Sequence, residues 1–193
     1  FMGYRRLENY NQDRFERKLF VTRKAIRSSL KDVEGFMITS MSSRTIVYKG
    51  MLIPHQMGNF FPDLSDSRLT SALALVHTRF PTNTFPRWDL VQPFRNLAHN
   101  GEINTLRGNI NWMRGRRATL ESPLYEDISE LQPIIIPRGS DSACMDNVFE
   151  FLIQSGYSLP HAMMMMVPEA WEHNPEMTPE KQAFYEFHEH LME

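Results

Sequence analysis

Cysteine is nearly absent from the sequence, which contains only Cys144 among its 193 residues. A single thiol excludes a disulfide within the chain and fits a reducing compartment. The sequence also lacks any apolar run close to the roughly 20 residues that span a bilayer. Its first residues are polar, without the apolar stretch of a signal peptide. We therefore expect a soluble intracellular protein that has no membrane partner.

The sequence also lacks a large excess of charge of either sign. Its formal net charge is −2, which gives no bulk electrostatic case for a nucleic-acid partner. Hydrophobic residues make up 41% of the chain and aromatic residues 11%, a composition typical of a globular protein. At this length we expect one domain with a fair hydrophobic core.

Two polar motifs follow short apolar runs in the middle of the chain. HTRFPTN follows the run Leu73–Val76, and HNGEIN follows the run Phe94–Ala98. Apolar runs of this length fit buried strands. Polar clusters at strand ends are common places for binding chemistry, so this region is the first candidate for a functional site.

These motifs closely resemble the glutaminase domain of glutamate synthases. That domain is a class II glutamine amidotransferase of the N-terminal nucleophile hydrolase type. The resemblance is carried by HTRFPTNTFPRW and HNGEINTLRGN, then by GSDSA with DNV, and by the methionine-rich run that ends in PEAW. It implies an α+β fold, the four-layer αββα sandwich. Residues 1–193 would form the central part of one such domain, incomplete at both ends, without the N-terminal nucleophile strand and the C-terminal strands.

The resemblance also implies a set of site residues. Splitting glutamine requires a nucleophile, donors for the developing oxyanion, and groups that hold the amino-acid end of the substrate. In the family the nucleophile is an N-terminal cysteine whose α-amine acts as base, and no residue of this chain matches it. Asn100 and Gly101 would form the oxyanion hole. Arg79 would bind the α-carboxylate and Asp141 the α-ammonium, with Thr82 and Asn83 also lining the pocket.

The resemblance extends to the parent enzyme. L-glutamine would be hydrolysed here, and ammonia would pass to 2-oxoglutarate in another domain that contains FMN and an iron–sulfur cluster, with no cofactor in these residues. Partners would be the remaining domains and an electron-donating subunit or ferredoxin, in the cytoplasm or in a plastid. The isolated chain is expected to be inactive because it lacks the nucleophile. The alternative is a non-catalytic glutamine-binding or scaffold module of the same fold.

Other side chains suggest chemistry that we do not favour. Cys144 falls on the apolar face of an expected helix, which indicates a buried, inert thiol. His188 and His190 are two residues apart and point to different sides of a helix. Four consecutive methionines, Met163–Met166, fit a core better than a soft-metal site. We therefore expect no metal site.

Basic residues on two expected helices raise a nucleic-acid alternative. Acidic residues are interspersed with the first group, so we interpret it as the solvated face of an amphipathic helix. We interpret the second group as surface ion pairs beside a packed tryptophan. The groups are Arg23, Lys24 and Arg27, and then Arg114, Arg116 and Arg117 beside Trp112.

Periodicity and capping signals predict the local structure. Helices are expected at residues 11–30 and 104–120, and three more after Ser140, Ser158 and Thr178, each a residue that can cap a helix N-terminus. Their expected apolar faces include Cys144 and Val148 in the third helix and Phe184 and Phe187 in the last. Strands are expected at residues 35–41, 45–49, 69–77 and 94–99.

Overall fold

The computed structural model describes residues 11–78, 86–103 and 105–189. Within these ranges the regular elements are helices, and no strand is formed. The α-helices are α1 (Gln12–Ser29), α2 (Met57–Phe60), α3 (Leu106–Gly115), α4 (Asp141–Gln154), α5 (Leu159–Met166) and α6 (Pro179–His188). The 3₁₀ turns are η1 (Pro54–Gln56), η2 (Pro62–Ser65), η3 (Trp88–Leu90), η4 (Arg116–Thr119) and η5 (Ile128–Leu131).

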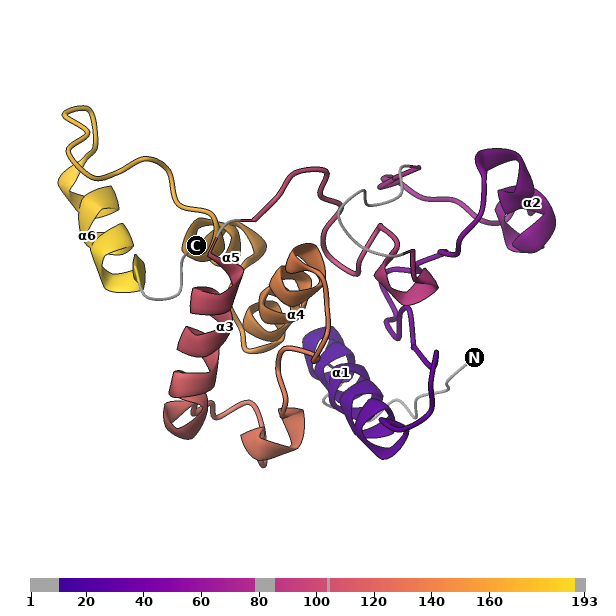
Figure 1. The fold of residues 1–193 in the computed structure, drawn as a ribbon, viewed down its shortest axis with the longest axis horizontal. Helices are drawn as coiled ribbons and strands as arrows, with labels where there is room; N and C mark the ends of the chain where they lie inside the picture. The colour runs from indigo at the N-terminus through magenta and orange to yellow at the C-terminus, as the bar shows by residue number, and fades with distance from the viewer. Residues whose placement is uncertain (1–10, 79–85, 104, 190–193) are drawn as a thin grey trace.

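The core lies where α1, α4 and α5 meet. Helix α4 contacts both α1 and α5, and η5 packs on α1; Figure 1 shows these helices grouped in the centre, with α6 and α2 at opposite ends. Helix α4 buries the face predicted from its sequence, because Cys144, Val148, Phe151 and Leu152 are only 3–6% exposed. Other buried core residues are Phe20, Leu131, Ile134, Phe149, Ala162 and Met165.

Side-chain caps fix the helix starts. The side chains of Ser140, Ser158 and Thr178 each accept a backbone N–H of the first turn of their helix, and Asn11 does the same for α1. Each cap satisfies an N–H group that has no partner within the helix. Gly156, at φ 100°, follows α4 in the left-handed region that favours glycine. These predicted boundaries are confirmed.

The four predicted strands are not formed in the described part of the chain. In two of them, residues 35–41 and 94–99, some backbone groups have other hydrogen-bond partners. Residues 36–42 have no regular secondary structure, and the guanidinium groups of Arg27 and Arg95 donate to the carbonyls of Phe36 and Ile38. The Val47 N–H donates to the Ser40 hydroxyl. Residues 94–97 form a tight turn in which the Phe94 N–H donates to the Leu97 carbonyl at 2.8 Å. Backbone groups used in this way are not available for a ladder. The αββα layering therefore stays a prediction.

The predicted solvated face of α1 is wrong. The Arg23 side chain is only 4% exposed and pairs with Glu150 of α4. The Lys24 ammonium binds the carbonyls of Pro133 and Ile134. Because these groups replace water as hydrogen-bond partners, the basic face of α1 turns toward the protein interior.

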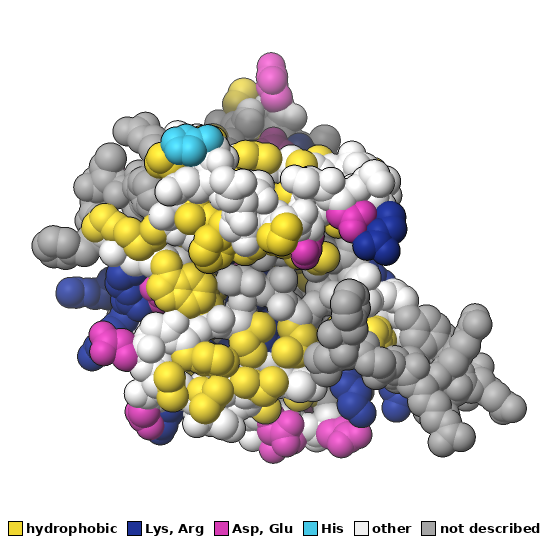
Figure 2. Space-filling model, turned by 90° about the vertical axis from the view of Figure 1, so that its right-hand side faces the viewer, with side chains coloured by type: hydrophobic (Ala, Val, Ile, Leu, Met, Phe, Trp, Pro, Cys, Tyr) yellow, Lys and Arg dark blue, Asp and Glu magenta, His cyan; other side chains and the backbone are white. Residues whose placement is uncertain are grey.

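Apolar side chains remain exposed on the part of the chain around α2. Phe60 is 63% exposed, and Leu73 and Val76 are 80% and 74% exposed. Figure 2 shows the corresponding face of the molecule, where apolar side chains lie next to one another between charged ones.

Aromatic contacts attach α6 to α5. The His161 ring of α5 lies 5.3 Å from the Phe184 ring and 5.8 Å from the His188 ring, measured between centroids. Tyr185 is buried, whereas Phe187, predicted for the apolar stripe, is 80% exposed. None of the described helices has the length and apolar character to cross a membrane.

Two methionines of α5 provide a test of the core. Met165 is 1% exposed, whereas Met163 is 45% exposed. We expect Met165→Ala to lower the free energy of unfolding by about 2–5 kcal/mol, because it removes buried atoms and leaves a cavity. Met163→Ala is the matched control and should change it by less than about 1 kcal/mol. Urea unfolding measures both, and equal effects would contradict the packing described here.

Candidate functional site

The N-terminus of α4 forms one side of the candidate site. Ser140 is the N-cap, and its hydroxyl accepts the Ala143 N–H at 3.2 Å. Asp141 occupies the first turn, where a carboxylate interacts favourably with the helix dipole. Its Oδ1 accepts the hydroxyl of Ser142 at 3.1 Å. The helix start therefore fixes both the position and the orientation of the Asp141 carboxylate.

The HNG loop, residues 99–103, is attached to this helix start at both ends. At its beginning, Nδ1 of His99 lies 3.1 Å from Oγ of Ser142. At its end, the Ile103 N–H donates to Oδ2 of Asp141 at 3.0 Å. Asn100 and Gly101 lie between these two attachments. The fold thus brings the predicted oxyanion donors next to the predicted ammonium acceptor, although about 40 residues separate them in the sequence.

A short chain of hydrogen bonds orients His99. The Ser142 hydroxyl donates a hydrogen bond to Asp141. The Ser142 oxygen can therefore accept a hydrogen bond from the imidazole. This arrangement favours the tautomer of His99 that carries a proton on Nδ1. Ser142 is buried, which shields the chain of hydrogen bonds from water.

A side-chain amide holds the backbone of His99. The Gln92 side chain donates to the His99 carbonyl at 2.7 Å and accepts the His99 N–H at 3.1 Å. Both backbone groups of His99 are therefore satisfied by one amide. The entry to the HNG loop is fixed without a neighbouring strand.

Glycine is required at position 101 because of the His99 ring. A Cβ at this position would lie 2.8 Å from Nε2 of His99, closer than carbon and nitrogen atoms pack. The ring cannot move freely because Ser142 and Gln92 hold the histidine. Gly101 therefore allows the loop to fold tightly against its own first side chain.

The predicted donors are available to a ligand. Asn100 and Gly101 are exposed, and neither forms a hydrogen bond with another described residue. Asp141 is half-buried and accepts from Ile103 and Ser142. A carboxylate offers about four acceptor positions, so Asp141 retains capacity for a ligand cation.

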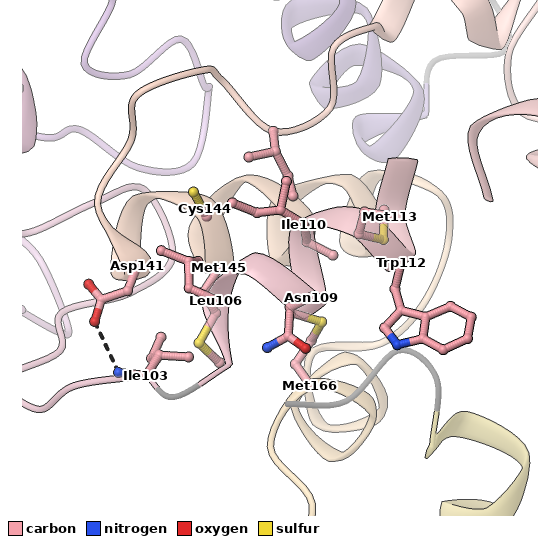
Figure 3. Close-up of a pocket in the computed structure, with 12 residues that line it drawn as sticks. Ile103, Leu106, Asn109, Ile110, Trp112, Met113, Asp141, Cys144, Met145 and Met166 are labelled. Atoms are coloured by element: carbon pink, nitrogen blue, oxygen red, sulfur yellow. Dashed lines mark hydrogen bonds between the residues drawn. The ribbon is translucent and has the colours of Figure 1, made fainter. Parts of the chain in front are cut away.

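A small apolar cavity lies beside Asp141, between α3, α4 and α5. Figure 3 shows Asp141 and its bond to Ile103 at one end and Trp112 at the other. Its volume is about 40 Å³, which is room for a few water molecules. Most of its lining is apolar, including Leu106, Cys144, Met145 and Met166. Trp112 is 51% exposed, so it is packed less tightly than predicted.

Three predicted site residues lie outside the described part of the chain. They are Arg79, Thr82 and Asn83, and their roles remain predictions. Conversely, sequence analysis missed three residues that shape the loop, namely Gln92, His99 and Ser142. His99 and Ser142 belong to the motifs HNG and GSDSA, and their place in these motifs could have pointed to a role in the site. Gln92 precedes its motif and carried no signal of its own.

Cys144 is unsuited to act as a nucleophile where it lies. The residue is 4% exposed. Burial, and to a smaller extent the nearby Asp141 carboxylate, raise the pKa of its thiol to about 11. The thiol stays neutral at physiological pH and is consequently a packing group.

The described residues show no group of three or more His, Cys, Asp or Glu side chains arranged to hold a metal ion.

A buried carboxylate of this region, Asp146, stabilises the fold. Oδ1 of Asp146 accepts the Asn96 N–H at 2.7 Å, which positions the turn that precedes the HNG loop. Burial raises the pKa of Asp146 to about 6.

Comparison with known families identifies the chain. The sequence model of the class-II glutamine amidotransferases matches residues 3–193. The chain belongs to the class-II glutamine amidotransferase family. This membership confirms the resemblance seen in the HTR, HNG and GSDSA motifs. It is also consistent with a fold of the N-terminal nucleophile hydrolase type.

Curated relatives of this amidotransferase chain are glutamate synthases. It is 51% identical over 181 residues to the glutamate synthase [NADPH] large chain of Bacillus subtilis, and 50% identical over 180 residues to glutamate synthase [NADH] of Schizosaccharomyces pombe. It is 45% identical over 190 residues to a chloroplastic ferredoxin-dependent glutamate synthase of Oryza sativa. These matches cover 92–95% of this chain but only 8–12% of the relatives.

Gly101→Ala tests the geometry of the HNG loop. The new methyl group should displace the His99 ring and lower the free energy of unfolding by about 1–2 kcal/mol, as overpacking does. Gly108→Ala is the matched control because a Cβ there meets nothing within 4 Å. It should raise helix stability by up to about 1 kcal/mol. NMR signals of the His99 imidazole should shift in the first variant alone; unchanged signals in both would contradict the described contact.

The reactivity of Cys144 tests its burial. With a pKa of about 11, the thiol is roughly one-thousandth ionised at pH 8, and folded protein should react with a thiol reagent far more slowly than unfolded protein. The rate should rise as the pH approaches 11 because the thiolate is the reacting form. Stopped reactions followed by mass spectrometry measure this rate. Equal rates in the folded and urea-unfolded chain would show that the thiol is accessible.

Proposed function

We propose that the HNG loop and the N-terminus of α4 bind L-glutamine for hydrolysis to glutamate and ammonia. The observation that supports this most directly is the double attachment of the loop to α4, through His99 to Ser142 and through Ile103 to Asp141. It places two available hydrogen-bond donors beside a carboxylate. An amide substrate with a free ammonium group needs these complementary groups.

In this proposal each site group has one role. The Asn100 side-chain amide and the Gly101 N–H donate to the oxyanion that forms on the substrate carbonyl. Asp141 accepts the α-ammonium group with its remaining acceptor capacity. Arg79 binds the α-carboxylate through two parallel hydrogen bonds, as a planar guanidinium does. Thr82 and Asn83 complete the pocket.

The nucleophile in this proposal is a cysteine from elsewhere in the parent protein. Cys144 is the only cysteine of the chain, and its thiol is buried and neutral. An N-terminal cysteine provides both a thiol and a free α-amine that acts as its base. These 193 residues alone are therefore expected to bind glutamine without releasing ammonia.

The parent protein is proposed to be a glutamate synthase that transfers the ammonia to 2-oxoglutarate. The similarity to glutamate synthases of three kinds of organism supports this. An iron–sulfur cluster needs several cysteine ligands, and this chain contains one cysteine, so its residues do not fit that cluster. We place the cluster and FMN in other parts of the parent, with a nicotinamide-linked subunit or ferredoxin as electron donor. The proposed location is the cytoplasm or a plastid.

Calorimetric titration of the chain with L-glutamine tests this function. Asp141→Asn should weaken glutamine binding by about ten- to a hundredfold, because one charge-assisted hydrogen bond is lost. Glutaramic acid, which is glutamine without its α-amino group, should bind weakly and be insensitive to this change. Glu102→Gln, which removes the same charge from an exposed position of the loop, is the control and should bind glutamine normally.

Three outcomes would contradict the proposal. Failure of the wild-type chain to bind glutamine would remove its basis. An equal loss for glutamine and glutaramic acid in Asp141→Asn would show that Asp141 only supports the loop. A parent protein without a cysteine at the mature start of the domain would instead favour the alternative, a glutamine-binding module that does not hydrolyse its ligand.

A further inference from the structure

A second cleft lies on another side of α4, where segments distant in the sequence meet. It is formed by α1, residues 37–38, residues 87–95, the turn at residues 136–139, and α4. Its volume is about 60 Å³, enough for a group of a few atoms. Five arginines line this arginine cleft, together with a single acidic residue, Asp89. The arginines are Arg23, Arg27, Arg87, Arg95 and Arg138.

Positive charge exceeds negative charge around the arginine cleft. Arg23 pairs with Glu150, and Nη1 of Arg95 lies 3.9 Å from both Asp146 and Glu150. These two carboxylates together with Asp89 give three negative charges against five arginines. Positive charge therefore remains in excess in a place that is partly shielded from water.

Two lysines next to the cleft are affected by the same excess of positive charge. Burial, and then the positive charge of Arg23, lower the pKa of Lys24 to about 8. Burial, and then the charge of Arg95, lower the pKa of Lys49 to about 8. Both ammonium groups bind backbone carbonyls, those of Pro133, Ile134 and Asp89, so while they are protonated they add to the positive charge near the cleft.

One arginine of the cleft wall has an unused donor. The Arg95 side chain is 9% exposed, and its Nε is buried without a hydrogen-bond partner among the described residues. Its Nη2 binds the Ile38 carbonyl. A buried donor without a partner is unfavourable, and a ligand oxygen that reached Nε would remove that cost.

Arg138, which also lines the cleft, presents its guanidinium group on the rim. Arg138 is exposed and forms no ion pair with another described residue. Its φ of 62° is an uncommon backbone conformation for a residue other than glycine, and such residues cluster at ligand-binding sites. Arg87, also on the rim, makes a two-point ion pair with Asp89 at 2.7 and 3.1 Å.

We propose that the arginine cleft binds a small doubly charged oxyanion, held between Arg95 in the wall and Arg138 on the rim. Guanidinium groups match the planar spacing of carboxylate and phosphate oxygens. A dianion suits a cleft in which positive charge is in excess. The ligand class is therefore a phosphate-type ion or a dicarboxylate.

This site does not rest on the proposed glutaminase function. The cleft uses Ala143 and Asn147 of α4, whereas Asp141 and Cys144 line the cavity beside the HNG loop. At 100° per residue these two pairs lie on different faces of the helix. The failure of one proposal therefore leaves the other intact.

Titration of the chain with sodium sulfate, which is a dianion at any pH used, tests the site. Disodium succinate is the dicarboxylate probe and sodium acetate the singly charged control, all at constant ionic strength. We expect saturable binding of sulfate, succinate or both, at least about tenfold tighter than that of acetate. The NMR signal of the Arg95 Nε–H group should shift on binding.

Two exposed arginines give a matched pair of variants that preserve the interior. Arg138→Gln should weaken dianion binding by about tenfold, the loss of one hydrogen bond to a charged group. Arg68→Gln removes an arginine that is 89% exposed and pairs with Asp66, away from the cleft lining, and should bind normally. Equal losses in both variants, acetate binding as tight as sulfate, or no saturable binding of either dianion would overturn the proposal. Preference for sulfate or for succinate would identify the ligand as phosphate-like or dicarboxylate.

Discussion

The structure depends on charged side chains that meet in its interior and connect α1, α4 and the turn before the HNG loop. They are Arg23, Arg95, Asp146 and Glu150. Removing one partner of a buried ion pair leaves an uncompensated charge, at a cost of about 3–5 kcal/mol. Asp146, which is fully buried, also fixes the backbone of Asn96. The network thus sets the position from which the loop reaches the start of α4.

Helix α4 combines three tasks on three parts of its surface. Its first turn holds the HNG loop through Asp141 and Ser142, its apolar face forms the core with α5, and its remaining face joins the buried charges. This arrangement explains the unusual number of polar groups buried on one helix, such as Ser142 and Asp146. Each of them binds a segment that is distant in the sequence.

Local signals in the sequence were sufficient for α1, α4, α5 and α6, because a cap such as Ser140 and an apolar face such as Val148 with Leu152 act within a few residues. Motif identity was sufficient for the family. The contact of His99 with Ser142 was not predictable in this way, since no local pattern specifies a pair 43 residues apart. The basic face of α1 was misinterpreted for the same reason, because the partner of Arg23 lies on α4.

The strand predictions were wrong for the same reason, because they also depended on contacts with residues distant in the sequence. Residues 94–99 were predicted as a strand from a short run in which only Phe94 is a β-favouring residue, and pairing also requires a second segment with free backbone groups. Arginine side chains occupy the carbonyls of Phe36 and Ile38, and a tight turn uses the N–H of Phe94. Composition describes what a segment prefers, whereas its hydrogen-bond partners decide what it adopts.

The role of Gln92 determines how the HNG loop responds to amino-acid substitution. Its amide gives His99 the same donor and acceptor pair that an adjacent strand would give, so one side chain does the work of a backbone partner. A backbone partner survives most substitutions, but a side-chain partner is lost with a single codon. Glutamate at position 92 would keep the acceptor and lose the donor, leaving the His99 carbonyl without its bond. The HNG motif can therefore be inherited intact while its conformation is lost through a residue outside it.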